Sequence, residues 1–63
     1  MTNIADVRVK DKMLVAGRFI EVVGIHHIND HPFQLYQLFF EELLAPLCFS
    51  SEFDVEIVRF GTN

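Results

Sequence analysis

The sequence predicts a mainly β domain, folded as a small five-stranded barrel or as a strongly curved sheet. Short runs rich in β-branched and aromatic residues recur between polar or glycine-containing turns, a rhythm typical of antiparallel strands. Both ends of the chain alternate apolar with charged residues, which is the period-two pattern of a strand with one buried face. A chain of 63 residues has no room for two cores, so we expect a single small domain over residues 1–63.

The charge patterns at the two ends are complementary. Residues 7–10 alternate valine with basic residues, and residues 53–57 alternate apolar with acidic residues. If these segments pair as strands, each cross-strand charge pair contributes roughly 0.2–1 kcal/mol, and the sheet closes on itself. The predicted partners are Arg8 and Lys10 on one strand and Asp54 and Glu56 on the other.

The next predicted elements form a hairpin. Residues 10–12 form a polar turn, and residues 13–15 form a short apolar strand. The hairpin corner is expected at residues 16–18, where Gly17 can take a positive φ.

Residues 19–28 are the clearest strand in the chain, because they are rich in β-branched residues. Both faces of this strand are apolar, so we expect it to be central or to bend sharply at Gly24. The sequence Asn-Asp-His-Pro at residues 29–32 predicts a turn after it.

The segment that follows has two interpretations. As a helix over about residues 31–45, packed on an antiparallel sheet in an α+β fold, it would use Asp30 as N-cap and end before Pro46. As strands, it would run over residues 33–40, turn at residues 41–42, and continue over residues 43–49. A one-turn helix at residues 50–52 would then lead into the last strand. We take the strands as the prediction and keep the helix as the alternative.

This order of short strands, with a one-turn helix before the closing strand, is similar to that of the SH3-like barrel. The resemblance is one of strand rhythm alone, and it implies no functional residues.

The apolar content predicts a partner. The chain is 51% hydrophobic and contains seven phenylalanines, yet a domain of this size buries only about 60% of its unfolded surface. Exposed apolar surface of this kind marks a contact site, so we expect a homo-oligomer or a complex with a larger protein. The predicted interaction residues are Phe33, Tyr36, Gln37, Phe39 and Phe40.

Charge and hydropathy disfavour other partners and locations. With a net charge of −4 the chain lacks the basic surface of most nucleic-acid-binding proteins. No apolar stretch approaches the roughly 20 residues that cross a bilayer, and no signal peptide is expected. The single cysteine, Cys48, excludes an internal disulfide, so we expect a cytoplasmic protein with Cys48 as a buried, inert thiol.

Catalytic and metal-binding patterns are weak. His27, Asp30 and His31 could converge across a turn as metal ligands, but their spacing matches no zinc motif. Asp54 and Glu56 are better explained as strand-face charges than as an acid–base pair. A cofactor pocket of about 300 Å³ or more is hard to form in so small a domain. We therefore expect no cofactor and no enzymatic activity.

The predicted function is a non-enzymatic interaction module that self-associates, docks on a larger protein, or does both. One alternative is a small acidic inhibitor that blocks a basic site on a nucleic-acid-handling enzyme. A second is a metal- or ligand-binding protein whose site is shared between subunits.

Overall fold

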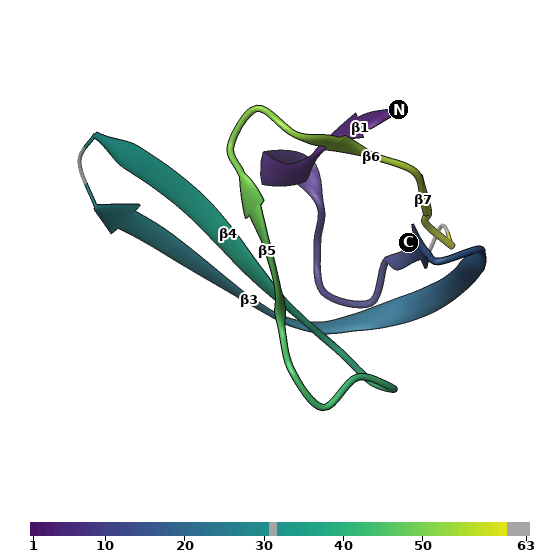
Figure 1. The fold of residues 1–63 in the computed structure, drawn as a ribbon. Coiled ribbons are helices and arrows are strands. Elements are labelled where there is room, and N and C mark those ends of the chain that lie inside the picture. Colours follow the sequence, from purple (N-terminus) through teal and green to yellow (C-terminus); the bar gives the residue numbers. More distant parts are fainter. Residues whose placement is uncertain (31, 61–63) are drawn as a thin grey trace.

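The computed structural model describes residues 1–30 and 32–60 and shows a mainly β fold (Figure 1). The prediction of a small curved β sheet is confirmed, and the α+β alternative is wrong because residues 33–40 form a strand. In chain order the elements are β1 (Thr2–Asn3), the 3-10 turn η1 (Ile4–Asp6), β2 (Lys12–Val15), β3 (Arg18–Asp30), β4 (Phe33–Phe40), β5 (Leu47–Ser50), β6 (Asp54–Val55) and β7 (Ile57–Val58).

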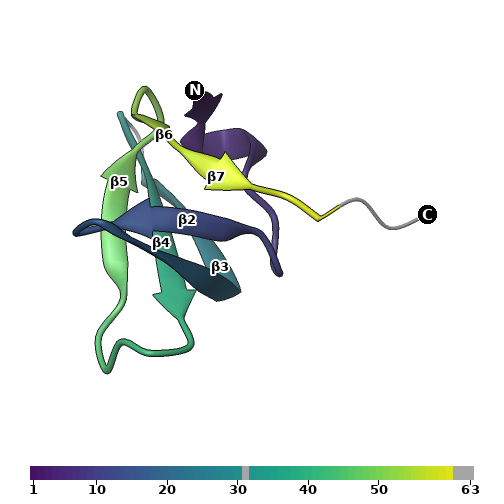
Figure 2. The same cartoon turned by 90° about the vertical axis from the view of Figure 1, so that its right-hand side faces the viewer.

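The strands form two antiparallel sheets. The larger has five strands in the order β5-β4-β3-β2-β7, and the smaller consists of β1 and β6. The long strand β3 pairs with β2 through its first residues and with β4 through the rest. Strand β3 thus belongs to two halves of the sheet, one formed with β2 and β7 and the other with β4 and β5. Because β3 is curved, the strands of the first half run across the direction of those of the second (Figure 2).

The bend in β3 lies where the sequence predicts it. Val22 pairs with Phe40 and Gly24 with Phe39, so the register shifts by one residue between them, as in a β-bulge. The skipped residue, Val23, is 47% exposed. The bulge lets β3 bend sharply while Val22 and Phe40 both stay buried.

The β2–β3 hairpin is also as predicted. Val15 pairs with Arg18 across a two-residue turn, in which Ala16 has φ 51° and Gly17 has φ 81°. Two consecutive positive φ angles define the type I′ turn, whose twist matches that of the flanking strands.

The terminal pairing differs from the prediction. Residues 7–10 form no strand, and the C-terminal strands pair instead with β1 and with β2. The Asn3 side chain accepts a hydrogen bond from Ala5 N (2.9 Å), and Ile4 N donates to Phe53 O (2.8 Å). Because these bonds place the N-terminal strand several residues earlier than predicted, Arg8 and Lys10 do not lie opposite Asp54 and Glu56.

Two predictions between β4 and β6 are also wrong. The ladder between β4 and β5 begins only at the Leu38–Leu47 pair, so residues 43–46 have no neighbouring strand and form a loop. Residues 51–52 form a turn rather than a one-turn helix, closed by a bond from Phe53 N to Ser50 O (3.0 Å).

The core lies on the concave side of the sheet and draws on both ends of the chain. Among the described residues its buried apolar members are Ile4, Val7, Met13, Ile20, Val22, Leu38, Phe40 and Val55. In the described part of the chain no helix is long and apolar enough to cross a membrane.

Candidate interaction surfaces

The five predicted interaction residues lie on β4, and strand alternation divides them between its two faces. Phe33, Gln37 and Phe39 lie on the outer, convex face, whereas Tyr36 and Phe40 lie on the inner face with the buried Leu38. Phe40 is only 3% exposed, so its predicted contact with a partner is wrong: it packs in the core. Phe33, at 69% exposed, is the most accessible of the set.

The outer face of β3, β4 and β5 carries a mixed apolar and polar surface, which we call the outer patch. Its polar centre is the row of His26, Gln37 and Cys48, which pair across the three strands. His26 Nδ1 and Gln37 Oε1 lie 3.4 Å apart. The apolar members on either side of this row are Ile28, Phe33, Leu35 and Phe39.

Cys48 is exposed on this face, and the prediction of a buried thiol is therefore wrong. Its neighbours Leu47 and Phe49 point to the inner side and pack against the core, and Cys48 alternates to the outer side.

The candidate metal ligands do not converge. Tyr36 and His27 pair across the strands, and their rings stack with centroids 4.4 Å apart and planes 1° from parallel. His27 therefore lies on the inner face of β3, and Asp30, three residues later, lies on the outer face. His31 lies outside the described residues. Within residues 1–30 and 32–60 no group of three or more histidine, cysteine, aspartate or glutamate side chains is placed to hold a metal ion.

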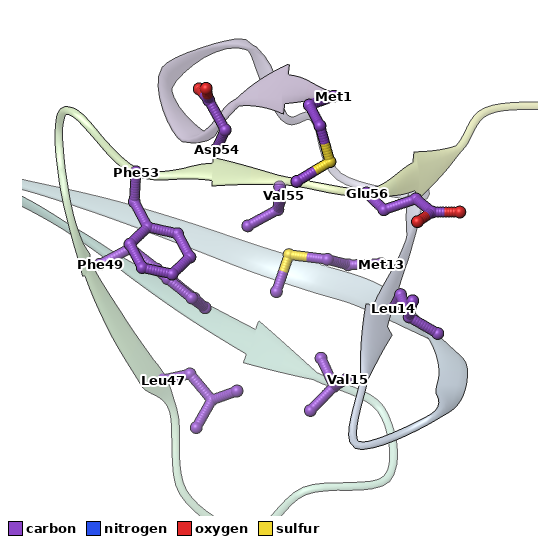
Figure 3. Close-up of a pocket in the computed structure, with 10 residues that line it drawn as sticks. All are labelled: Met1, Met13, Leu14, Val15, Leu47, Phe49, Phe53, Asp54, Val55 and Glu56. Atoms are coloured by element: carbon purple, nitrogen blue, oxygen red, sulfur yellow. The ribbon is translucent and has the colours of Figure 1, made fainter.

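A pocket of about 440 Å³ opens on the inner side of the sheet, between β5 and the strands β2 and β6 (Figure 3). Leu47 and Phe49 form one wall and Val15 the opposite one, while Met13 and Val55 lie between them. The pocket exists because β5 and β7 are the two edges of the sheet, and no backbone ladder closes the gap between β5 and β2. This volume exceeds the roughly 300 Å³ that is hard to form in so small a domain, but the pocket is largely open and not enclosed.

The rim of this pocket is acidic, and its interior is apolar. Asp54 and Glu56 contribute the only charged side chains among the ten lining residues, and both side chains are directed away from the apolar interior (Figure 3). The lining contains no histidine, cysteine, serine or lysine. The pocket is therefore equipped to bind an apolar group beside a cation, and it offers no nucleophile.

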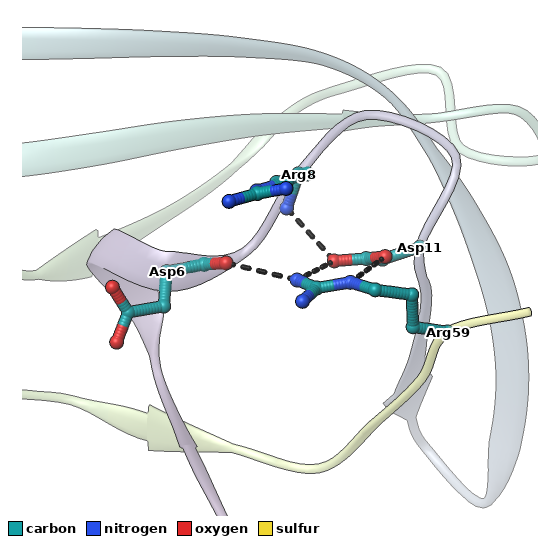
Figure 4. A network of polar contacts seen from close by, with 4 residues as sticks. All are labelled: Asp6, Arg8, Asp11 and Arg59. Atoms are coloured by element: carbon teal, nitrogen blue, oxygen red, sulfur yellow. Dashed lines mark hydrogen bonds and ion pairs between the residues drawn. The ribbon is translucent and has the colours of Figure 1, made fainter. Parts of the chain in front are cut away.

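An ion pair between the buried Asp11 and the partly exposed Arg59 joins the two ends of the chain (Figure 4). Arg59 Nε and one terminal nitrogen donate to the two carboxylate oxygens of Asp11, both at 2.8 Å. Arg8 N also donates to Asp11 (2.8 Å), and Arg59 donates to Asp6 O (3.0 Å). The bonds from Arg59 lower the pKa of Asp11 below its usual value, and burial opposes this effect without reversing it.

The sequence contains no local signal for this pair, because its partners are 48 residues apart. In this ion pair the acid comes from the N-terminal half of the chain, and the base, Arg59, directly follows β7. The pair therefore differs from the predicted pairing both in its residues and in which end of the chain supplies the positive charge. Because this ion pair joins the two ends of the chain, it stabilises the fold and is not part of a binding surface.

Comparisons of the chain with protein-family models, with curated proteins and with solved structures found no match. The outer patch and the pocket are therefore the features from which a function can be inferred.

Proposed function

We propose that this protein is a non-enzymatic interaction module that associates with a second copy of itself through exposed apolar surface. The observation that carries the proposal is the number of large apolar side chains left outside the core: twelve among the described residues. Phe33 and Phe39 bring two of these onto a single sheet face, the outer patch. Large apolar side chains gathered on one exposed face of a small domain are typical of a protein contact.

The composition of the outer patch supports this function. Aromatic residues are enriched in interfaces because they bury large areas at a low entropic cost. The His26, Gln37 and Cys48 row places polar groups between the apolar ones, so the patch can also form hydrogen bonds across a contact. The same face of two copies can meet about a two-fold axis, the commonest arrangement in homo-oligomers.

The proposal extends to the fold similarity and to the cellular compartment. The order of the five strands and the pairing of the terminal strands β1 and β6 support a similarity to the SH3-like barrel, here with an open side. The exposed Cys48 thiol suits a reducing compartment such as the cytoplasm.

The acidic-inhibitor alternative has less support. Apart from Asp11 the carboxylates are not buried, but they are distributed over β3, β6 and several loops and form no concentrated patch. Binding to a basic enzyme would weaken steeply with salt, whereas an apolar contact would persist.

The test is native mass spectrometry of the wild type and of a Phe33→Ser/Phe39→Ser variant, with sedimentation equilibrium at several concentrations. We expect a multiple of 7.3 kDa for the wild type and a shift towards monomer for the variant. Phe60→Ser is the matched control, because Phe60 is similarly exposed (66%) but lies outside the outer patch. A wild type that is monomeric at all concentrations would contradict the proposal.

A further inference from the structure

We propose that the acidic-rimmed pocket of one copy binds the turn formed by Arg8, Val9 and Lys10 of a second copy. We call these three residues the basic turn. This inference rests on the proposed self-association and adds to the outer patch a second pair of surfaces that contributes to it.

The pocket requires an apolar group flanked by positive charge. Its interior is apolar and its volume of about 440 Å³ is large enough for an aliphatic side chain with part of its backbone. The carboxylates of its rim are available for a partner. Asp54 Oδ1 accepts only a long bond from Asn3 (3.4 Å), and no hydrogen bond or ion pair of the Glu56 side chain is present among the described residues.

The basic turn has the complementary pattern. Val9 is 48% exposed and lies between the two cations. Neither the Arg8 nor the Lys10 side chain makes an ion pair within the described part of the chain. The other three cations are engaged: Arg18 with Glu42 at 2.7 Å, Arg59 with Asp11, and Lys12 over the Phe60 ring at 5.5 Å.

The basic turn is also held in one conformation. Asp11 N donates to Arg8 O (3.1 Å), and the Asp11 carboxylate accepts from Arg8 N. Lys10 N donates to Val22 O (2.8 Å), and Lys10 itself has φ 83°. A turn that is ordered before binding loses less conformational entropy when it binds.

Other exposed apolar segments fit the rim less well. Leu44 is fully exposed, but its loop begins with Glu41 and Glu42, which the acidic rim would repel. Phe33 pairs directly with Asp30. Val9 is the exposed apolar residue whose two neighbours are both cations without an ion-pair partner in the described residues.

The opposite charges of residues 8–10 and residues 54–56 thus attract each other between two copies and not within one. The basic turn and the pocket are different parts of the chain, so two copies can exchange both contacts about a two-fold axis, or the contact can repeat head-to-tail into a closed ring or a filament.

The experiment reverses the charges on each side. R8E/K10E and D54K/E56K are each expected to weaken association at least tenfold, because like charges then face each other. An equimolar mixture of the two variants restores it, since each acidic turn meets a basic rim and each basic turn an acidic rim. The control, E41K/E42K, changes the net charge as D54K/E56K does, but at exposed turn positions outside both the pocket and the outer patch, and it is expected to associate as the wild type does.

Val9→Ser provides a second measurement that leaves all charges in place, and it is also expected to weaken association. Circular dichroism checks that each variant is folded. Folded charge variants that associate like the wild type, or a mixture that fails to recover, would overturn the inference.

The outcomes separate this inference from the proposed function. If Phe33→Ser/Phe39→Ser dissociates the oligomer and the charge variants do not, self-association stands and the pocket has another occupant. A wild type that is monomeric, whether or not its pocket takes up a small apolar probe or a foreign basic peptide, would overturn both.

Discussion

The two ends of the β3–β4 hairpin differ in nearly every respect. At its base, Val22 and Phe40 pair inside the core, beside the joint where Asp11 binds Arg59. Its distal part, which we call the arm, comprises residues 26–30 and 33–35 and extends beyond the rest of the molecule (Figure 1). No residue of the arm is buried.

The base of the hairpin contributes mainly to stability, and the arm offers surface for binding. Removing apolar area from water is the main source of folding free energy, so the base contributes most of it. The arm is held by its backbone ladder and by cross-strand contacts such as the stack of His27 on Tyr36. Its apolar side chains, Phe33 above all, remain accessible to a partner.

The largest expected effect is the difference in stability between two leucine-to-alanine variants, one on the inner face of β4 and one on its outer face. Leu38→Ala removes a side chain with no exposed surface and is expected to lower the free energy of unfolding by about 2–5 kcal/mol. Leu35→Ala, on the half-exposed outer face of the arm, is expected to cost about 1 kcal/mol or less. Urea denaturation followed by circular dichroism measures both. Equal losses would show that the arm belongs to the core.

A smaller effect is expected at the joint between the termini. Asp11→Asn removes a buried charge bonded to Arg59 and is expected to cost about 1–3 kcal/mol at pH 7. The folded-state pKa of Asp11 is lowered, so its contribution is present above its unfolded pKa near 4 and is lost as the pH falls through the folded value.

The stability difference between wild type and Asp11→Asn should therefore be large at pH 7 and shrink below about pH 4. Urea titrations at several pH values give this difference directly. Asp30→Asn, at an exposed position on the arm, is the control and should change little. A difference independent of pH would show that the charge of Asp11 is not what stabilises the joint.

The smallest effect is expected at the β2–β3 turn. Ala16 has a positive φ, which favours asparagine over alanine, so Ala16→Asn is expected to raise stability by about 0.5–1 kcal/mol. Gly17→Ala should act in the opposite direction, because Gly17 also has a positive φ. Thermal unfolding of the two variants measures both signs. A loss on Ala16→Asn would contradict the type I′ assignment.

Part of the fold follows from local chemistry and could be predicted. The strand over residues 19–28, its bend at Gly24 and the turn at Gly17 depend on β-branched residues and on glycine. The burial of Val55 follows from strand alternation, but that of Val7 does not, because residues 7–10 form no strand and Val9 is 48% exposed.

The candidate surfaces could be predicted only in part. The sequence marks the aromatic residues of segment 33–40 as candidates only as a group, and choosing between Phe39 and Phe40 requires knowing that residues 33–40 form a strand and which face is covered. Helix propensity and strand propensity nearly balance over residues 33–40. In the structure this segment is a strand between β3 and β5, in which Tyr36 pairs with His27 on one side and with Phe49 on the other. The pocket has no sequence signal, because it depends on which strand edges remain unpaired.

The sequence by itself determined the strand character of β3, its hairpin turn, and the excess of apolar residues over what a domain this small can bury. These are properties of single residues and of neighbours along the chain. The tertiary structure alone decided which strands meet at the termini, the bond between Asp11 and Arg59, and the opening between β5 and β2. Each of these joins residues far apart in sequence, and several pairings of similar local energy compete until the whole core selects one.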